Sequence, residues 1–311
     1  MAASIYLKIT ALFVVLTALL MAVGFAVGVI LQTNPFLYMG IALVLAAVLN
    51  FVMYYYSDSM VIKLSRAKII NESDNPVLFA AVRNVAQKAN IPMPRVGIVD
   101  SPAPNAFATG RGPDKAVVCA TSSILQALTP AELEAVIGHE IGHVVHRDVL
   151  MSSVAATMAG AISYIGNIAL FSMFFGGGGS NNRNGNAQLL ALVAIILVPI
   201  GATFVRLGIS RDDEYNADEY GAKLTHNPGG LISALTKIES QVKAKGFARG
   251  RRSGGGSQNP NSGPSPATAS LWIVNPFRGS ALMELFSTHP SMPHRIERLR
   301  KIAREMNVYV P

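Results

Sequence analysis

The residues His139–Glu140–Ile141–Gly142–His143 decide how this chain is organised and which chemistry it can carry out. Side chains four residues apart on a helix lie on the same face, so both imidazoles can reach one metal ion. The glutamate beside the first histidine can then approach a metal-bound water, whose pKa zinc lowers to near 7. This pattern is typical of the zinc helix of a metalloprotease. A chance match is rare in a chain with six histidines. We therefore expect a metal site with one Zn²⁺ per chain.

The residues Thr129–Pro130–Ala131–Glu132 predict the start of the helix that carries this pattern. Threonine at the N-cap, proline at the first helical position and glutamate two residues later form a capping box. We expect the helix to run to about Asp148 and to continue into the apolar segment that follows. Another helix is expected to begin at Asp74–Asn75–Pro76, and three short strands are expected at 95–100, 105–109 and 116–120.

The composition indicates a membrane protein. Half of the 311 residues are apolar and only 14% are charged, well below the quarter that is usual in soluble domains. The apolar residues are grouped in four segments, each at or near the length of about 20 residues that a helix needs to cross a bilayer. These segments are 9–31, 36–56, 149–175 and 189–207. We therefore predict an α-helical membrane protein with four transmembrane helices.

The basic residues predict the orientation of these helices. The short connections between the first two and the last two segments carry no charge except Arg183, whereas residues 58–148 carry nine Lys or Arg and the chain from Ser210 onward carries fourteen. By the positive-inside rule, both large pieces are cytoplasmic. We then attribute the net charge of +8 to the basic residues on the cytoplasmic side and to their attraction to the anionic lipid bilayer. No nucleic-acid or nucleotide partner is expected, and the single Cys119 excludes an internal disulfide.

These observations predict the domain organisation. Residues 1–57 form an anchor with two spans, and 149–207 form a transmembrane hairpin. Residues 58–148 and 208–311 together form one cytoplasmic α+β domain, so the hairpin is inserted into it. Residues 249–270, rich in Gly, Ser and Pro, are expected to be a flexible linker within that domain.

A catalytic zinc needs a third protein ligand and an open fourth position. The metzincin pattern is absent. Its glycine position holds His146, and the position of its third histidine holds Val149. His146 is interpreted as a helix-surface residue or a partner of Asp148. Glu214 is the best candidate ligand, and Asp218, one turn further on the same face, could accept a hydrogen bond from a ligating histidine. On spacing alone, other acids compete with Glu214: Asp212, Asp213 and Glu219.

Several motifs along the chain form a recognisable set. Besides the two N-terminal apolar segments and the helix Glu132 to Asp148, they are Pro104–Asn105–Ala106–Phe107–Ala108–Thr109–Gly110, Ser210–Arg211, Glu214–Tyr215, Ala217–Asp218, Phe286–Ser287–Thr288–His289–Pro290 and Arg295–Ile296. With this set the chain resembles the HtpX-like membrane zinc endopeptidases, relatives of the CAAX-prenyl endopeptidases, over nearly its whole length. It departs from them at Asp213, where the family usually has a basic residue, and at Ser291, where it usually has proline.

The resemblance implies a zincin-like metalloprotease domain with a set of site residues. His139, His143 and Glu214 would bind zinc, and Glu140 would act as the catalytic base. Asp218 and Arg295 would support the site, and His289 would stabilise the oxyanion or support the site. The residues Asn105, Ala106, Phe107, Ala108 and Thr109 would form an edge strand that holds the substrate backbone by β-augmentation.

The resemblance also implies a biological role. The protein would be a zinc-dependent endopeptidase that cleaves misfolded or damaged membrane proteins for quality control under stress, and self-cleavage would be a further activity. It would act at the cytoplasmic face of a bacterial inner (plasma) membrane as a multi-pass protein.

Two other functions stay open at this point. An intramembrane-cleaving zinc protease would carry its metal inside the bilayer, but the charges of Glu132, Glu134, Arg147 and Asp148 are costly in hydrocarbon and argue against this. A non-catalytic membrane scaffold or chaperone with a structural zinc would contain the same ligands without proteolysis.

Overall fold

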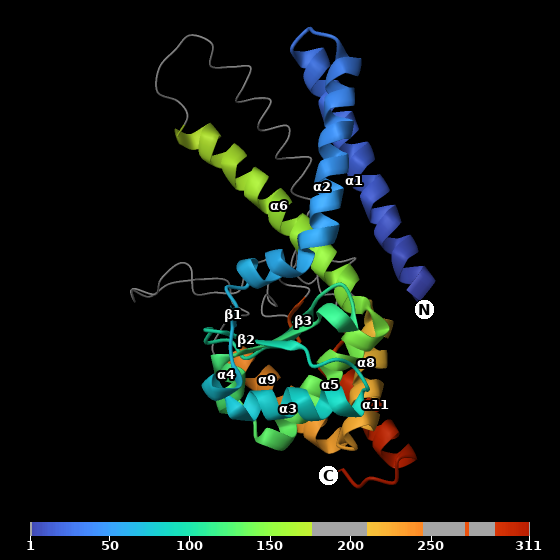
Figure 1. Ribbon diagram of the computed structural model, residues 1–311, viewed down its shortest axis with the longest axis vertical. Helices are drawn as coiled ribbons and strands as arrows, with labels where there is room; N and C mark the ends of the chain where they lie inside the picture. Colours follow the sequence, from blue (N-terminus) through green and yellow to red (C-terminus); the bar gives the residue numbers. More distant parts are fainter. Residues whose placement is uncertain (1, 176–209, 245–270, 274–289, 311) are drawn as a thin grey trace.

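The computed structural model describes residues 2–175, 210–244, 271–273 and 290–310 (Figure 1). The fourth apolar segment, the linker 249–270 and His289 lie outside these ranges, so the predictions for them are not tested by the structure. The division into domains likewise stays a prediction.

Two long helices lie side by side at the N-terminal end of the chain. Helix α1 spans Ala2–Ile30 and α2 spans Pro35–Leu64, and Asn34 caps α2 by accepting a hydrogen bond from the backbone N–H of Phe36 at 3.0 Å. Both are long and apolar enough to cross a membrane by length and composition. Their outer faces carry exposed apolar side chains such as Val44. Apolar residues all around a helix are typical of a hydrocarbon environment.

The third apolar segment is also helical. Helix α6 spans Asp148–Phe175, and its first half packs against α1 and α2 through Leu150, Val154 and Met158. Figure 1 shows α6 leaving the rest of the molecule at an angle to α1 and α2. Whether α6 crosses a membrane stays a prediction.

A four-stranded sheet has the order β1-β2-β4-β3. Its strands are β1 (Lys68–Ile69), β2 (Arg95–Val99), β3 (Ala106–Thr109) and β4 (Val117–Thr121). Strands β2 and β4 are parallel, and the other two pairs are antiparallel. The three strands expected from the sequence are present within one residue, whereas the two-residue β1 was not predicted. Strand β3 lies at an edge of the sheet.

Both faces of the sheet are buried. Because side chains alternate along a strand, Ala108 and Val118 face the main core under α3 (Pro76–Lys88) and α5 (Pro130–His146). Phe107 and Cys119 face the opposite way, toward Val61 of α2 and Ala156 of α6. The sheet therefore joins the long N-terminal helices to the remaining helices. These are α4 (Ser122–Ala127), α8 (Arg211–Thr225), α9 (Pro228–Ala244) and α11 (Met292–Glu305), with short 3₁₀ turns at Glu72–Asp74 and Pro113–Lys115.

The start of α5 is the predicted capping box. The hydroxyl of Thr129 accepts from the backbone N–H of Glu132 at 3.3 Å, and the Glu132 carboxylate accepts from the backbone N–H of Thr129 at 2.8 Å. The expected continuation into the third apolar segment is wrong, because α5 ends at His146. Arg147 adopts a left-handed backbone with φ 67°, and α6 begins at the next residue. Neither glycine nor proline marks this break in the sequence.

The carboxylate of Glu132 also joins α5 to α9. It accepts hydrogen bonds from Ser233 Oγ at 2.6 Å and from Lys237 Nζ at 2.7 Å. Burial opposes ionisation of Glu132, but the hydrogen bonds from Lys237 and Ser233 outweigh it and lower its pKa to about 2. Glu132 therefore stabilises the fold as an anion.

We predict that Glu132→Gln lowers the free energy of unfolding by about 1–2 kcal/mol near neutral pH. Because the folded-state pKa is depressed from 4.5 to about 2, this contribution is complete above pH 4.5. It is lost as the pH falls toward 2. Denaturant unfolding in detergent at several pH values measures the difference between the two proteins. A difference that stays constant down to pH 2 would contradict the role of the charge.

Candidate metal centre

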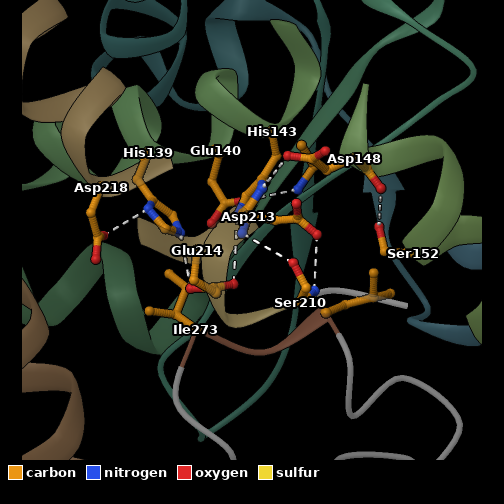
Figure 2. A network of polar contacts seen from close by, with 12 residues as sticks. His139, Glu140, His143, Asp148, Ser152, Ser210, Asp213, Glu214, Asp218 and Ile273 are labelled. Carbon is orange, nitrogen blue, oxygen red and sulfur yellow. Dashed lines mark hydrogen bonds and ion pairs between the residues drawn. The ribbon is translucent and has the colours of Figure 1, made fainter. Parts of the chain in front are cut away.

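Three buried side chains converge from two helices (Figure 2). His139 and His143 lie one turn apart on α5, and Glu214 lies in the first turn of α8. Glu214 places one carboxylate oxygen 3.7 Å from His139 Nε2 and the other 3.6 Å from His143 Nε2. The ligand atoms of all three residues lie within 4.8 Å of one another. In a tetrahedral zinc site with bonds of about 2.0–2.1 Å, ligand atoms are separated by about 3.3 Å, so a small contraction closes this triangle around an ion.

Close packing of α5 against α8 makes this convergence possible. A Cβ atom at Gly221 would lie 2.6 Å from the backbone nitrogen of His139, and one at Gly138 would lie 2.8 Å from Thr225. Gly142 similarly faces the backbone of Ala217. The two helix backbones are therefore in contact at the level of the site, and a larger residue at Gly221 would push Glu214 away from the histidines.

The acids that competed with Glu214 on spacing have other positions. Asp213 belongs to the cap of α8, where its carboxylate accepts from the backbone N–H of Ser210 at 2.9 Å. Glu219 is paired with Lys223 at 2.6 Å, and Asp212 is exposed. The capping pattern Ser210–Asp213 is visible in the sequence and could have eliminated Asp213 as a ligand.

Each histidine has a carboxylate at its other ring nitrogen. Asp218 Oδ1 lies 2.9 Å from Nδ1 of His139, and Asp148 Oδ2 lies 3.4 Å from Nδ1 of His143. Such carboxylates fix the orientation and tautomer of a metal-binding imidazole, so that Nε2 faces the metal. The contact between Asp148 and His143 was not predicted from the sequence, where Asp148 was considered only as a partner of His146.

The contact between Asp148 and His143 depends on the backbone geometry of the residue before Asp148. On a continuous helix a residue five positions after His143 would point about 140° away from it, but the left-handed Arg147 turns the chain and brings Asp148 back. His146 instead packs edge-on against Tyr220, with ring centroids 5.3 Å apart.

Arg295 of α11 is a fully buried cation next to the ligands. Its guanidinium forms two hydrogen bonds with Asp218, at 2.8 and 2.6 Å, and its Nη1 lies 3.3 Å from Glu214 Oε2. Burial acts to raise the pKa of Asp218, but the neighbouring Arg295 outweighs it and lowers that pKa. Asp218 is therefore held as an anion that can orient His139.

The buried charges of the site fit a divalent cation. The site buries four carboxylates, which are those of Glu140, Asp148, Glu214 and Asp218. Arg295 is the only buried Lys or Arg among the described residues. Buried carboxylates without balancing positive charge are unfavourable. Two imidazole nitrogens and one carboxylate oxygen are also the donor set of many catalytic zinc sites. The residues present therefore fit Zn²⁺.

The carboxylate of Glu140 lies between the ligands and the edge strand. It is buried and accepts a hydrogen bond from the backbone N–H of Ala108 at 3.0 Å. Burial raises its pKa, which moves the carboxylate toward the range of a general base. For His143, burial acts to lower the pKa, but Asp148 and Glu214 outweigh it and raise that pKa well above its usual value. Because a metal binds the neutral imidazole, metal binding to His143 depends on pH.

The edge strand presents its backbone to this site. Asn105 precedes β3 and its carbonyl accepts from the backbone N–H of Thr121. Because backbone groups alternate along an antiparallel pair, Ala106 and Ala108 direct theirs away from β4, to the edge that pairs with no other strand. The hydroxyls of Thr109 and Ser153 are hydrogen-bonded at 2.8 Å, which joins β3 to α6.

The side chain of Asn105 contacts the segment 271–273, and its expected role in substrate binding stays a prediction. Its side-chain amide donates to the carbonyl of Leu271 at 3.1 Å and accepts from the N–H of Ile273 at 2.9 Å. The segment 271–273 thereby forms a wall of a cavity of about 20 Å³, which has room for one water or one ion. Its described lining is Phe107, Ala108, His139, Glu140, His143, Val149, Ser152, Glu214, Leu271, Trp272 and Ile273.

Comparison with known proteins identifies the family of the chain. The profile of Peptidase family M48 matches residues 72–303, a range that contains every described residue of the metal centre. The chain belongs to peptidase family M48. Members of this family are metalloproteases, and the resemblance to HtpX-like endopeptidases noted from the motifs is confirmed by the relatives of the chain.

Three relatives are each described as "Protease HtpX homolog". The protein from Pyrococcus furiosus is 46% identical over 293 residues, 94% of each chain. The protein from Thermococcus sibiricus is 43% identical over 99% of each chain, and that from Syntrophobacter fumaroxidans is 42% identical over 95% of this chain and 98% of its own. Among solved structures, S. mikatae Ste24p matches with a TM-score of 0.44 and 17% identity, covering 96% of this M48 chain and 67% of its own.

We predict that Gly221→Ala destabilises the protein by about 1–3 kcal/mol and weakens zinc binding, because the new Cβ overlaps the backbone of His139 and forces α8 outward. Unfolding measurements and zinc titration of the purified variant test both effects. The matched control is Gly40→Ala, since a Cβ at Gly40 meets no atom within 4 Å. Unchanged zinc affinity in Gly221→Ala would contradict the dependence of the site on this helix contact.

Proposed function

We propose that this protein is a zinc-dependent endopeptidase that cleaves extended segments of misfolded or damaged membrane proteins from the cytoplasmic side of the cell membrane. One observation supports this most strongly. The Glu140 carboxylate contacts both a triangle of metal-ligand atoms and the edge of β3 that pairs with no other strand. A base, a metal site and the strand proposed to bind the peptide thus lie side by side, as peptide-bond hydrolysis requires.

The residues have separate roles in this reaction. His139, His143 and Glu214 hold the zinc, which supplies Lewis acidity and lowers the pKa of a bound water when present. Glu140 removes a proton from the attacking water and returns it to the departing amine. Asp218 and Asp148 keep the two imidazoles oriented, and Arg295 keeps Asp218 ionised. His289 is proposed to stabilise the oxyanion, on the resemblance alone.

The substrate would bind as an added strand. The backbone groups of Ala106 and Ala108 face the edge of β3 that pairs with no other strand. Both residues are buried, so an extended peptide that forms main-chain hydrogen bonds there must displace what covers this edge. Such binding requires a substrate segment without its own secondary structure, which supports misfolded chains as the substrate class. For a peptide to pair with Ala108, the hydrogen bond of its N–H to Glu140 must be exchanged, and this frees the carboxylate for the water.

The membrane location is proposed from the helices. α1 and α2 are long and apolar enough to span a bilayer, and α6 begins with the shorter apolar stretch Asp148–Ile162. The relatives are described as HtpX homologues, and the motifs of this chain resemble those of membrane proteases. With the basic residues of 58–148 on the inner side, the metal centre lies in the cytoplasm. A fourth span at 189–207 and the bacterial inner membrane are the remaining parts of this proposal.

The substitution Glu140→Gln tests the catalytic role. We expect it to retain zinc, because Glu140 is not a ligand, and to lower the cleavage rate of a soluble unfolded protein by about 10²–10⁴-fold. The matched control is Glu134→Gln on the same helix, whose carboxylate pairs with Lys88. Cleavage and zinc content are measured on the same preparations. Cleavage at the wild-type rate by Glu140→Gln would refute the proposed base.

The same assay separates the alternatives. A chelator that stops cleavage without unfolding the protein excludes the scaffold with a structural zinc. Cleavage of a soluble substrate excludes a protease that acts only inside the bilayer, whereas cleavage restricted to membrane-embedded segments would favour it.

A further inference from the structure

Two arginines outside the metal centre lie where the long helices meet the sheet. Arg111 is in the turn between β3 and β4, and Arg147 is the left-handed residue between α5 and α6. The Arg147 guanidinium lies against this turn, with Nη1 3.3 Å from the position of a Cβ on Gly112. The two cations therefore belong to one small region of the surface.

An aromatic side chain of α2 completes this region. The Arg111 guanidinium carbon lies 5.3 Å from the ring centroid of Tyr55, and the ring of Tyr55 packs on Phe51 with centroids 4.5 Å apart. Tyr55 is 46% exposed, so one side of it is open to the surroundings. Stacking on the ring holds Arg111 in place while leaving donor groups available.

The charges of this region are not paired with a carboxylate in the part of the chain that the structure describes. Neither Arg111 nor Arg147 forms an ion pair with a carboxylate among the described residues, and Arg111 Nε is buried without a hydrogen-bond partner there. A buried donor without a partner is costly. An anionic ligand with several acceptor oxygens would satisfy it and would match the fork of N–H groups on each guanidinium.

The location of the region identifies the kind of anion. Tyr55 lies in the aromatic trio that ends the apolar part of α2, and Arg147 directly precedes the apolar part of α6. Both helices emerge from the rest of the molecule next to β3 (Figure 1). If α2 and α6 enter the membrane as proposed above, this region lies at the level of the lipid headgroups, where tyrosine and arginine are favoured.

We propose that Tyr55, Arg111 and Arg147 form a binding site for the headgroup phosphate of an anionic phospholipid. The two guanidinium groups donate to the phosphate oxygens, and the exposed side of Tyr55 contacts the glycerol and upper chain region. A zwitterionic lipid binds less well, because its cationic headgroup is repelled by the same arginines. The inference rests on the proposed membrane location but not on catalysis.

This site would connect the membrane surface with the metal centre. Arg147 is followed directly by Asp148, whose carboxylate contacts His143. A lipid bound at Arg147 holds the break between α5 and α6 in the observed conformation. It thereby holds Asp148 near the imidazole. The membrane would thus stabilise the arrangement of the site without contacting the metal.

The test compares thermal unfolding of the full chain in neutral detergent with dioctanoyl phosphatidylglycerol, dioctanoyl phosphatidylcholine or inorganic phosphate. At a phosphatidylglycerol concentration about 100 times Kd, the Tm should rise by about 5 °C. Each arginine contributes about fivefold in affinity. Arg111→Gln should therefore keep about two-thirds of the rise, and the double variant with Arg147→Asn about one-third.

The variants and controls make the outcome decisive. Asparagine tolerates the left-handed backbone at position 147, and Arg111→Gln alone serves if the double variant does not fold. The pair Arg300→Gln and Arg304→Gln on α11 removes the same charge far from α2 and should keep the full rise. Glu140→Gln should also keep it, so a failed catalytic proposal does not affect this result. An equal rise in the double variant, with phosphatidylcholine, or with phosphate alone would overturn the proposed site.

Discussion

The contact between the backbones of α5 and α8 is the constraint on which the rest of the site depends. The two histidines are placed by one helix, but Glu214 comes from another helix more than seventy residues later in the chain. It reaches them because Gly138, Gly142 and Gly221 let the helices touch. Burying backbone groups at this contact is not unfavourable, because they are hydrogen-bonded within their own helix. The contact also holds the three ligand atoms near the distances found in a zinc site.

The balance of buried charge is the second condition on which the metal centre depends. Burying several carboxylates together with two imidazoles is unfavourable unless positive charge is present. Arg295 supplies part of it through Asp218 and Glu214, and a divalent cation among the ligands would supply the rest. A bound divalent cation would offset these buried negative charges, so metal affinity and stability would be coupled.

Local patterns in the sequence predicted much of this structure. The same-face pair His139 and His143 follows from helical periodicity, the start of α5 follows from Thr129 and Glu132, and three strands follow from short β-type runs between turns. Each of these depends on residues that are neighbours in the chain. The resemblance to HtpX-like endopeptidases also rests on such short motifs, His139–Glu140–Ile141–Gly142–His143 among them, and was visible before the fold was known.

Features that depend on tertiary contacts or on unusual backbone were not predictable in the same way. Periodicity gave no reason to end α5 at Arg147, because an arginine in a left-handed conformation has no sequence signal, and this break decides that Asp148 contacts His143. The two-residue strand β1 exists only through its pairing with β2. The hydrogen bond between Glu140 and Ala108 joins helix and edge strand across the site, which spacing alone cannot show.

The metal centre requires that His139, His143 and Glu214 bind one zinc ion together. The most direct test is the zinc content and zinc affinity of the purified protein, compared with those of Glu214→Ala. We expect one zinc per chain in the wild type and a large loss of affinity in the variant. Unchanged zinc affinity in Glu214→Ala would mean that another group supplies the third ligand, and would contradict the metal centre described here.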